Sequence, residues 1–99
     1  MTAMQLLLTT APAVDPDAEH RETVRRVIVD SAARDHGRVN PNDVRARLAW
    51  LDVPPHIVGQ TYRALRLEGR LIPDGWVTSD DVKGGNNGKP ARAYRWVAP

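Results

Sequence analysis

The 99-residue chain contains no cysteine, which excludes disulfide bonds, cysteine–zinc sites and thiol nucleophiles. Phenylalanine is also absent, so the three tryptophans and two tyrosines are the only aromatic side chains available for packing. No long hydrophobic run is present. The apolar stretch Leu6-Leu7-Leu8 follows no basic residue and is too short for a secretory segment or a membrane span. We therefore expect a cytoplasmic protein with no membrane partner.

The charges are unevenly divided along the chain, although the net charge is only +2. Residues 1–55 carry seven arginines and eight acidic residues, a balance of −1, whereas residues 56–99 carry seven basic and four acidic residues, a balance of +3. A basic excess of this kind favours a nucleic-acid surface in the second half of the chain. An uneven solvated surface explains the same charges equally well, so charge alone does not decide between them.

The first part of the chain predicts an arm followed by a helix. Residues 1–14 show no helical period and predict a flexible N-terminal arm, in which Met4 to Leu8 is apolar enough to dock on a partner. Residues 15–99 predict one domain. Asp15 is the expected N-cap of its first helix, and Gly37 the expected C-terminal stop. The inward face is predicted from spacings of three and four residues, at Val24, Val27, Ile28 and Ser31.

Two further helices and a hairpin are predicted after a short connector. Asn40 to Asp43 presents a cap, a proline and an acid in order, and opens a helix with Val44, Leu48 and Leu51 inward. The prolines at 54 and 55 separate it from a third helix over about 55–68, closed by Gly69, with an inward face predicted at Val58, Tyr62 and Leu65.

The end of the chain predicts two strands. A strand begins at residues 76–78, a glycine-rich turn covers 83–89, and 91–97 alternate as the return strand. The predicted fold class is therefore α+β, with a three-helix core whose open side is covered by a C-terminal β-hairpin.

The third helix carries a polar arc opposite its apolar face. At about 100° per residue this arc contains His56, Gly59, Gln60, Arg63 and Arg66. A helix about 10–12 Å across fits the major groove, which is about 12 Å wide. Arginine pairs with guanine and glutamine with adenine through two hydrogen bonds each, so Arg63 and Gln60 are the expected base contacts. Gly59 allows close approach of the backbone, and Arg66 is expected to meet phosphate. The alternative is a solvated helix face, and Leu67 near the arc favours it.

The hairpin supplies further cations beside this arc. Lys83, Lys89 and Arg92 flank a loop without bulky side chains, and a basic loop of this kind can lie along phosphates or enter the minor groove. Arg70, just after the third helix, completes the predicted DNA-binding set. An ordinary exposed hairpin tip explains the loop by itself, but the helix and the loop in this order favour a nucleic-acid site.

Two segments resemble the winged helix-turn-helix transcriptional regulators. Residues 58–72, VGQTYRALRLEGRLI, are similar to the recognition helix and exit of that family, and residues 88–96, GKPARAYRW, to its return strand. The resemblance covers about residues 15–97 and implies double-stranded DNA binding by a small bacterial or phage-type regulator. It implies that Gly59, Gln60 and Arg63 face the groove and that Lys89 and Arg92 lie on the wing. The chain departs from the family in its double-proline turn and in lacking an added sensor or dimerisation domain.

No residue pattern indicates catalysis or cofactor binding. The three histidines are spread along the chain without the spacing of a metal site, and we expect surface or capping roles for them. Asp80 and Asp81 lack converging partners, so we expect a solvated strand edge rather than acid–base or metal chemistry. We therefore expect no enzyme, no cofactor and no metal. The three tryptophans are expected in or at the edge of the core, with Trp50 the best candidate for a partner contact.

Two functions remain open from the sequence. A duplex-DNA regulator is the leading hypothesis, and a homodimer is expected if its target is palindromic. The alternative is a winged-helix protein-interaction adaptor without DNA binding. It is favoured by the modest net charge, by Leu67 and Trp50, and by the apolar arm, which would hold a protein partner or a second copy of the chain.

Overall fold

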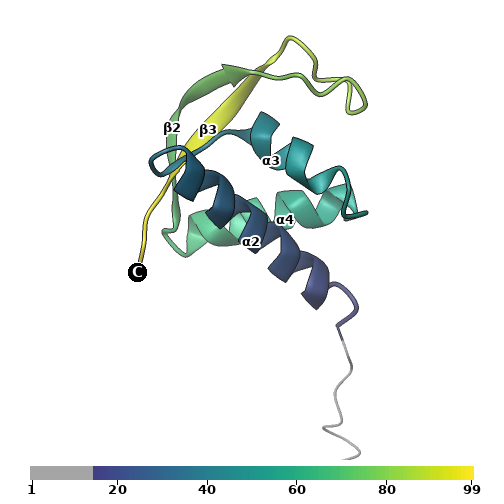
Figure 1. Cartoon of the computed structure of the whole chain (residues 1–99), viewed down its shortest axis with the longest axis vertical. Helices are drawn as coiled ribbons and strands as arrows, with labels where there is room; N and C mark the ends of the chain where they lie inside the picture. The colour runs from purple at the N-terminus through teal and green to yellow at the C-terminus, as the bar shows by residue number, and fades with distance from the viewer. Residues whose placement is uncertain (1–14) are drawn as a thin grey trace, which may run out of the picture.

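The structure, a computed structural model, describes residues 15–99, so the arm predicted for residues 1–14 lies outside it. The element order is α2 (Ala18–Arg34), β1 (Arg38–Val39), α3 (Pro41–Leu48), α4 (Pro55–Leu67), β2 (Leu71–Thr78) and β3 (Pro90–Trp96) (Figure 1). The fold is α+β, with three helices and a three-stranded antiparallel sheet. The prediction of three helices followed by a hairpin is confirmed. In the part of the chain that is described, no helix is both long and apolar enough to cross a membrane.

Local capping residues set most helix ends. The Asn40 side chain accepts a hydrogen bond from the Asn42 backbone N–H at 2.9 Å, and Pro41 occupies the first turn of α3, as predicted. Gly69, with φ of +78°, closes α4 as predicted, and the next N–H, that of Arg70, donates to the Leu65 carbonyl at 2.8 Å.

Two helix boundaries differ from the prediction. Helix α2 begins at Ala18, with Asp17 rather than Asp15 as its N-cap; the Asp15 carboxylate instead accepts a bond from the Asp17 backbone N–H. Helix α3 ends at Leu48, so Leu51 lies in the following turn and is 46% exposed rather than part of the inner stripe. The positive φ of Asp52, +51°, reverses the chain there before the two prolines.

The sheet has the order β1-β3-β2, with β3 in the centre. Strand β1 pairs with the end of β3, Val39 opposite Tyr94, and β2 pairs along the whole of β3, from Leu71 opposite Trp96 to Thr78 opposite Pro90. The prediction that this strand begins at residues 76–78 is wrong, because β2 already pairs with β3 from Leu71; a bulge between Pro73 and Trp76 interrupts the β2–β3 register. Beyond the strands, Ser79 and Lys89 remain paired through a 2.8 Å backbone bond, so the hairpin extends almost to its loop.

The core lies where α2, α3 and α4 meet one face of the sheet. Its fully buried members come from every element, namely Val24, Ile28, Val39, Val44, Ile57, Leu65, Leu71 and Ala93. In α4 the innermost line is Ile57, Thr61 and Leu65, whereas the sequence predicted Val58, Tyr62 and Leu65. Val58 and Tyr62 are only partly buried. The shift arises because α2 covers one side of α4 and the sheet covers another. The most buried residues of α4 are therefore those that lie between these two sides.

Candidate nucleic-acid interface

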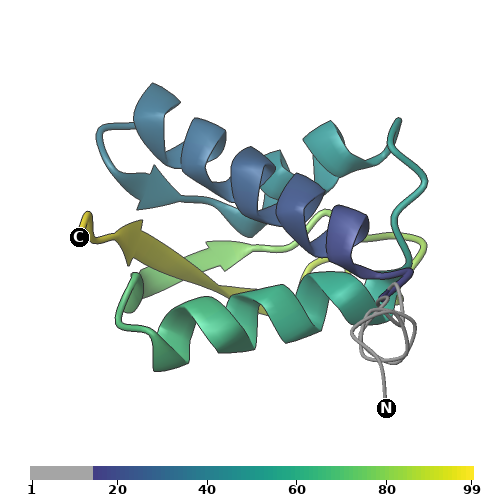
Figure 2. The same cartoon turned by 90° about the horizontal axis from the view of Figure 1, so that it is seen from below.

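The predicted polar arc of α4 faces solvent. All five of its members, His56, Gly59, Gln60, Arg63 and Arg66, are exposed. Figure 2 shows α4 along the lower edge of the molecule, with α2 and the sheet on its inner side, so within residues 15–99 no helix or strand covers its outer surface. No atom lies within 4 Å of a side-chain carbon built at Gly59, so packing does not require the glycine and the helix backbone is open to a partner there. Leu67 shares this arc and is 83% exposed.

The cations of the molecule fall into two groups. Six arginines form ion pairs that join elements or brace helices, and these are Arg21, Arg25, Arg26, Arg45, Arg47 and Arg95. Within residues 15–99, eight cations have no such partner. Two of these, Arg34 and Arg38, belong to α2 and β1. The other six lie on α4, at its exit or on the hairpin, and they are the predicted cations Arg63, Arg66, Arg70, Lys83, Lys89 and Arg92.

The ion pair between Arg25 and Glu68 shows how this separation arises. Residues 53–67 contain no acidic side chain, and Glu68, just after α4, is held by Arg25 of α2 at 3.2 Å. The one carboxylate that would neutralise the end of α4 is thus turned toward α2. Consequently the arc of α4 presents positive charge without an internal counter-ion.

The remaining predicted residues differ in their exposure to solvent. Lys83 and Lys89 are exposed on the hairpin loop, whereas Arg70 and Arg92 are half-buried. Arg92 lies on β3 with its guanidinium carbon 3.9 Å from the centre of the Trp76 ring. Arg66 of α4 lies 5.7 Å from the centre of the Tyr94 ring, also on β3. The structure therefore joins α4 to the hairpin through aromatic rings of the sheet.

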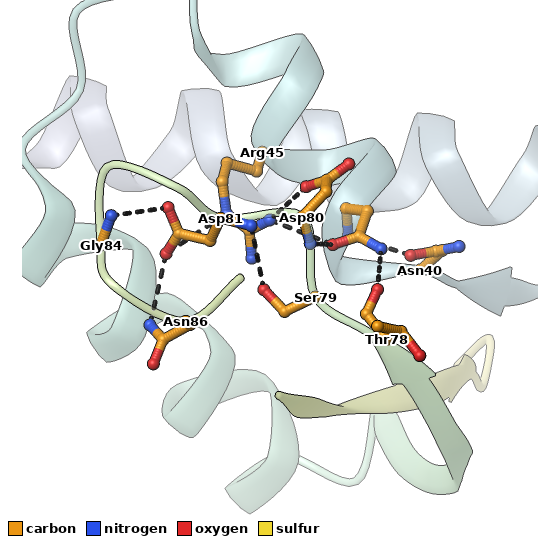
Figure 3. Close-up of polar contacts among 9 residues, drawn as sticks. Asn40, Arg45, Thr78, Ser79, Asp80, Asp81, Gly84 and Asn86 are labelled. Carbon is orange, nitrogen blue, oxygen red and sulfur yellow. Dashed lines mark hydrogen bonds and ion pairs between the residues drawn. The ribbon is translucent and has the colours of Figure 1, made fainter. Parts of the chain in front are cut away.

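The hairpin loop is anchored on α3. Arg45 donates to the Asp80 carboxylate at 2.9 Å and lies 3.8 Å from that of Asp81. The Asn42 amide donates to the Thr78 carbonyl at 2.8 Å and accepts from the Asp80 backbone N–H at 3.1 Å. Figure 3 shows these contacts bridging the base of the loop and α3. The base of the loop is thus held by α3.

Asp81 organises the loop itself. Its carboxylate accepts bonds from the Gly84 backbone N–H at 2.9 Å and from the Asn86 amide at 3.3 Å (Figure 3). These bonds and the nearby Arg45 hold the pKa of the Asp81 carboxyl below its usual range. A side-chain carbon at Gly84 would collide with the Asp81 carboxylate, so a larger residue there would displace that carboxylate from its bonds to the loop. The prediction of a solvated acidic pair fits Asp80, whose side chain is 71% exposed, but is wrong for Asp81, whose side chain is 17% exposed and holds the loop in shape.

The positions of the tryptophans differ most from the sequence-based prediction. Trp50 is 90% exposed in the α3–α4 turn, and Trp76 is 59% exposed, whereas only Trp96 packs against the core. The prediction of core or core-edge positions is wrong for Trp50 and for Trp76. The register of the hairpin, which sets Trp76 opposite Arg92, is the feature from which their contact could have been inferred.

Comparisons with known proteins add no family or relative to this geometry: no family model, no curated protein and no solved structure matches the chain.

Proposed function

We propose that this chain is a small winged-helix protein that binds double-stranded DNA and acts as a transcriptional regulator. In this proposal α4 is the recognition helix in the major groove, and the hairpin is the wing along the phosphate backbone. The observation that carries the proposal is the separation of the cations: within residues 15–99, those on α4, at its exit and on the hairpin lack carboxylate partners, except Arg95, which pairs with Asp74.

The separation matters because phosphate competes with carboxylate for the same donors. An arginine already paired within the chain must give up that bond before it can bind phosphate, whereas an unpaired arginine gives up only water. Six cations on one continuous set of elements meet this condition. Each phosphate that they neutralise releases counterions and favours binding to a polyanion.

The outer arc of α4 supports base reading in addition to charge. Gln60 and Arg63 are exposed and form no side-chain hydrogen bond or ion pair within residues 15–99, so their end groups are available for two-pronged hydrogen bonds. Helix order and the pairing of β1 with β3 are compatible with a winged helix, in which the hairpin would be the wing.

The test is fluorescence anisotropy with random and genomic duplexes over a salt series. We expect affinity to fall as salt rises, with a slope of up to about −5 in log K against log salt if all six cations meet phosphate. Lys89→Ala is expected to weaken all duplexes about equally and to lower the slope by about 0.9. No duplex binding at 50 mM salt would overturn the proposal.

A specific observation favours the second candidate, a protein-interaction adaptor. Trp50, Leu67 and Val82 are large apolar side chains that are 90%, 83% and 75% exposed. A partner that covers them would bind with little dependence on salt, because the contact is apolar. Sedimentation of the wild type, of Trp50→Ser and of a chain lacking residues 1–12 separates the cases. Stable, salt-independent association that Trp50→Ser abolishes would favour the adaptor.

A further inference from the structure

A row of alternating arginines and aromatic rings crosses from α4 onto the hairpin. Arg66 of α4 lies over the Tyr94 ring of β3 at 5.7 Å, and Arg92 of β3 lies over the Trp76 ring of β2 at 3.9 Å. We call these four residues the arginine–aromatic strip. The Tyr62 ring beneath it, 5.7 Å from that of Tyr94, fixes the strip to the core.

Strand register places the strip on one face of the sheet. Trp76 and Arg92 are directly paired across β2 and β3, so their side chains share a face. Tyr94 is two residues from Arg92 on the same strand and therefore lies on that face too, with α-carbons about 7 Å apart. On α4, Arg66 is three residues after Arg63, so the strip continues directly from the polar arc.

The neighbouring Arg95 shows that the strip differs from the rest of the sheet. Arg95 is on the opposite face of β3, where it pairs with Asp74 at 3.2 Å. Neither Arg66 nor Arg92 has a carboxylate partner within residues 15–99. On one face of β3, Arg95 is therefore held in an ion pair within the fold. On the other face, Arg92 and the nearby Arg66 are available to bind an external anion.

An aromatic ring stacked against a guanidinium holds it in a position from which it can bind phosphate. The ring covers one face of the guanidinium and leaves the N–H groups at its edge free to donate. Because the stacked group is already held, less side-chain entropy is lost when it binds two phosphate oxygens at once. Two such groups in a row, with Arg66 and Trp76 exposed and Arg92 and Tyr94 partly exposed, suit a polymer with repeated phosphates better than a single small anion.

We propose that the arginine–aromatic strip is the path of one DNA strand between the recognition helix and the wing. Arg66 and Arg92 bind its phosphates, and Tyr94 and Trp76 are positioning residues that hold those two guanidiniums. The inference rests on the proposed function, and it assigns binding roles to two aromatic residues of the sheet. It further predicts that base reading and backbone binding are separable, because Arg63 lies outside the strip.

The test is a double-mutant cycle on duplex affinity. Arg92→Ala is expected to lower the salt slope by about 0.9. Trp76→Ala is expected to weaken random and preferred duplexes alike by about 5-fold, and Trp76→Phe, which keeps a ring, to retain most of the affinity. In the Arg92→Ala background, Trp76→Ala should add little, because its effect passes through Arg92. Arg95→Ala is the matched control on the same strand, and thermal melting of each variant reports its fold.

Several outcomes would overturn the strip. It fails if Trp76→Ala weakens binding equally with and without Arg92, or if Arg66→Ala and Arg92→Ala leave the salt slope unchanged while Arg63→Ala weakens binding. In the last case the proposed function stands and the strip alone falls. Equal affinity for a polyglutamate peptide would overturn the assignment to phosphate. Absence of duplex binding by the wild type would overturn both proposals together.

Discussion

Replacement of Arg63 by alanine tests the base-reading part of the proposal most directly. The side chain is exposed on the outer arc of α4 and forms no ion pair within residues 15–99. Its loss should therefore change the free energy of unfolding by no more than about 0.5 kcal/mol. Any larger effect on DNA binding then belongs to the interface and not to the fold.

The expected effect depends on what Arg63 contacts. If it binds a guanine edge through two hydrogen bonds, its removal costs about 1–3 kcal/mol at the preferred site, or about 5- to 150-fold in Kd. If Arg63 binds only phosphate, its removal lowers the slope of log K against log salt by about 0.9. Between 50 and 200 mM salt, a slope change of this size alters the Kd by only about 3- to 4-fold, and the effect is the same for every DNA sequence. The ratio of preferred to random affinity therefore separates the two roles.

The assay is anisotropy with the preferred and a scrambled duplex at two salt concentrations. Arg26→Ala is the matched control, because Arg26 is an exposed α2 arginine whose partner Glu22 lies one turn away on the same helix. Arg63→Lys keeps the positive charge but removes the planar guanidinium. It should therefore bind the scrambled duplex as tightly as the wild type does, but with a lower ratio of preferred to scrambled affinity. An unchanged ratio in Arg63→Ala, with an intact melting curve, would refute the base-contact role.

The remaining predictions concern the fold that positions the interface. Arg45→Ala should speed backbone amide hydrogen exchange in the loop while lowering stability by about 1 kcal/mol, since its nearer ion-pair partner, Asp80, is largely exposed; unchanged exchange would contradict the anchor. Ile57→Ala should cost about 2–5 kcal/mol because the side chain is fully buried, so the melting temperature should fall by at least about 8 °C. The pKa values of Asp43 and Asp81 are lowered, chiefly by bonds from Ser31 and from the Gly84 N–H, so protonation favours the unfolded chain. Their contribution to stability should be present above about pH 4 and lost as pH falls below it, and an acid titration in which Asp43→Asn leaves the curve unchanged would contradict this.

Features that depend on a few neighbouring residues were predicted well. The cap at Asn40, the stop at Gly69 and the exposure of the polar arc on α4 follow from side chains within one helical turn, and the structure has all three. Their physics is local: a cap needs only the adjacent backbone N–H groups, and a positive φ needs only a glycine. The assignment of this arc to DNA stays a prediction.

The rotation of α4 was predicted less well. Period alone placed Val58 and Tyr62 inward with Leu65, but α2 and the sheet cover different flanks, which moves Ile57 and Thr61 to the centre. The helical period shows which residues share a face of the helix. Which face is buried most deeply depends on the elements that pack against each side. A partly buried tyrosine and a buried threonine are then compatible with the same sequence.

By itself, the sequence determined the elements, their order and the uneven distribution of charge, because these depend on residue type and on neighbours along the chain. Only the tertiary structure decided which charges are cancelled. Asp80 and Asp81 lie 35 and 36 positions from Arg45 in the chain, yet they neutralise it, and Arg25 captures Glu68 across 43 positions. Coulomb attraction depends on distance in space, so the cations left free beside Tyr94 and Trp76 could be identified only once the chain was folded.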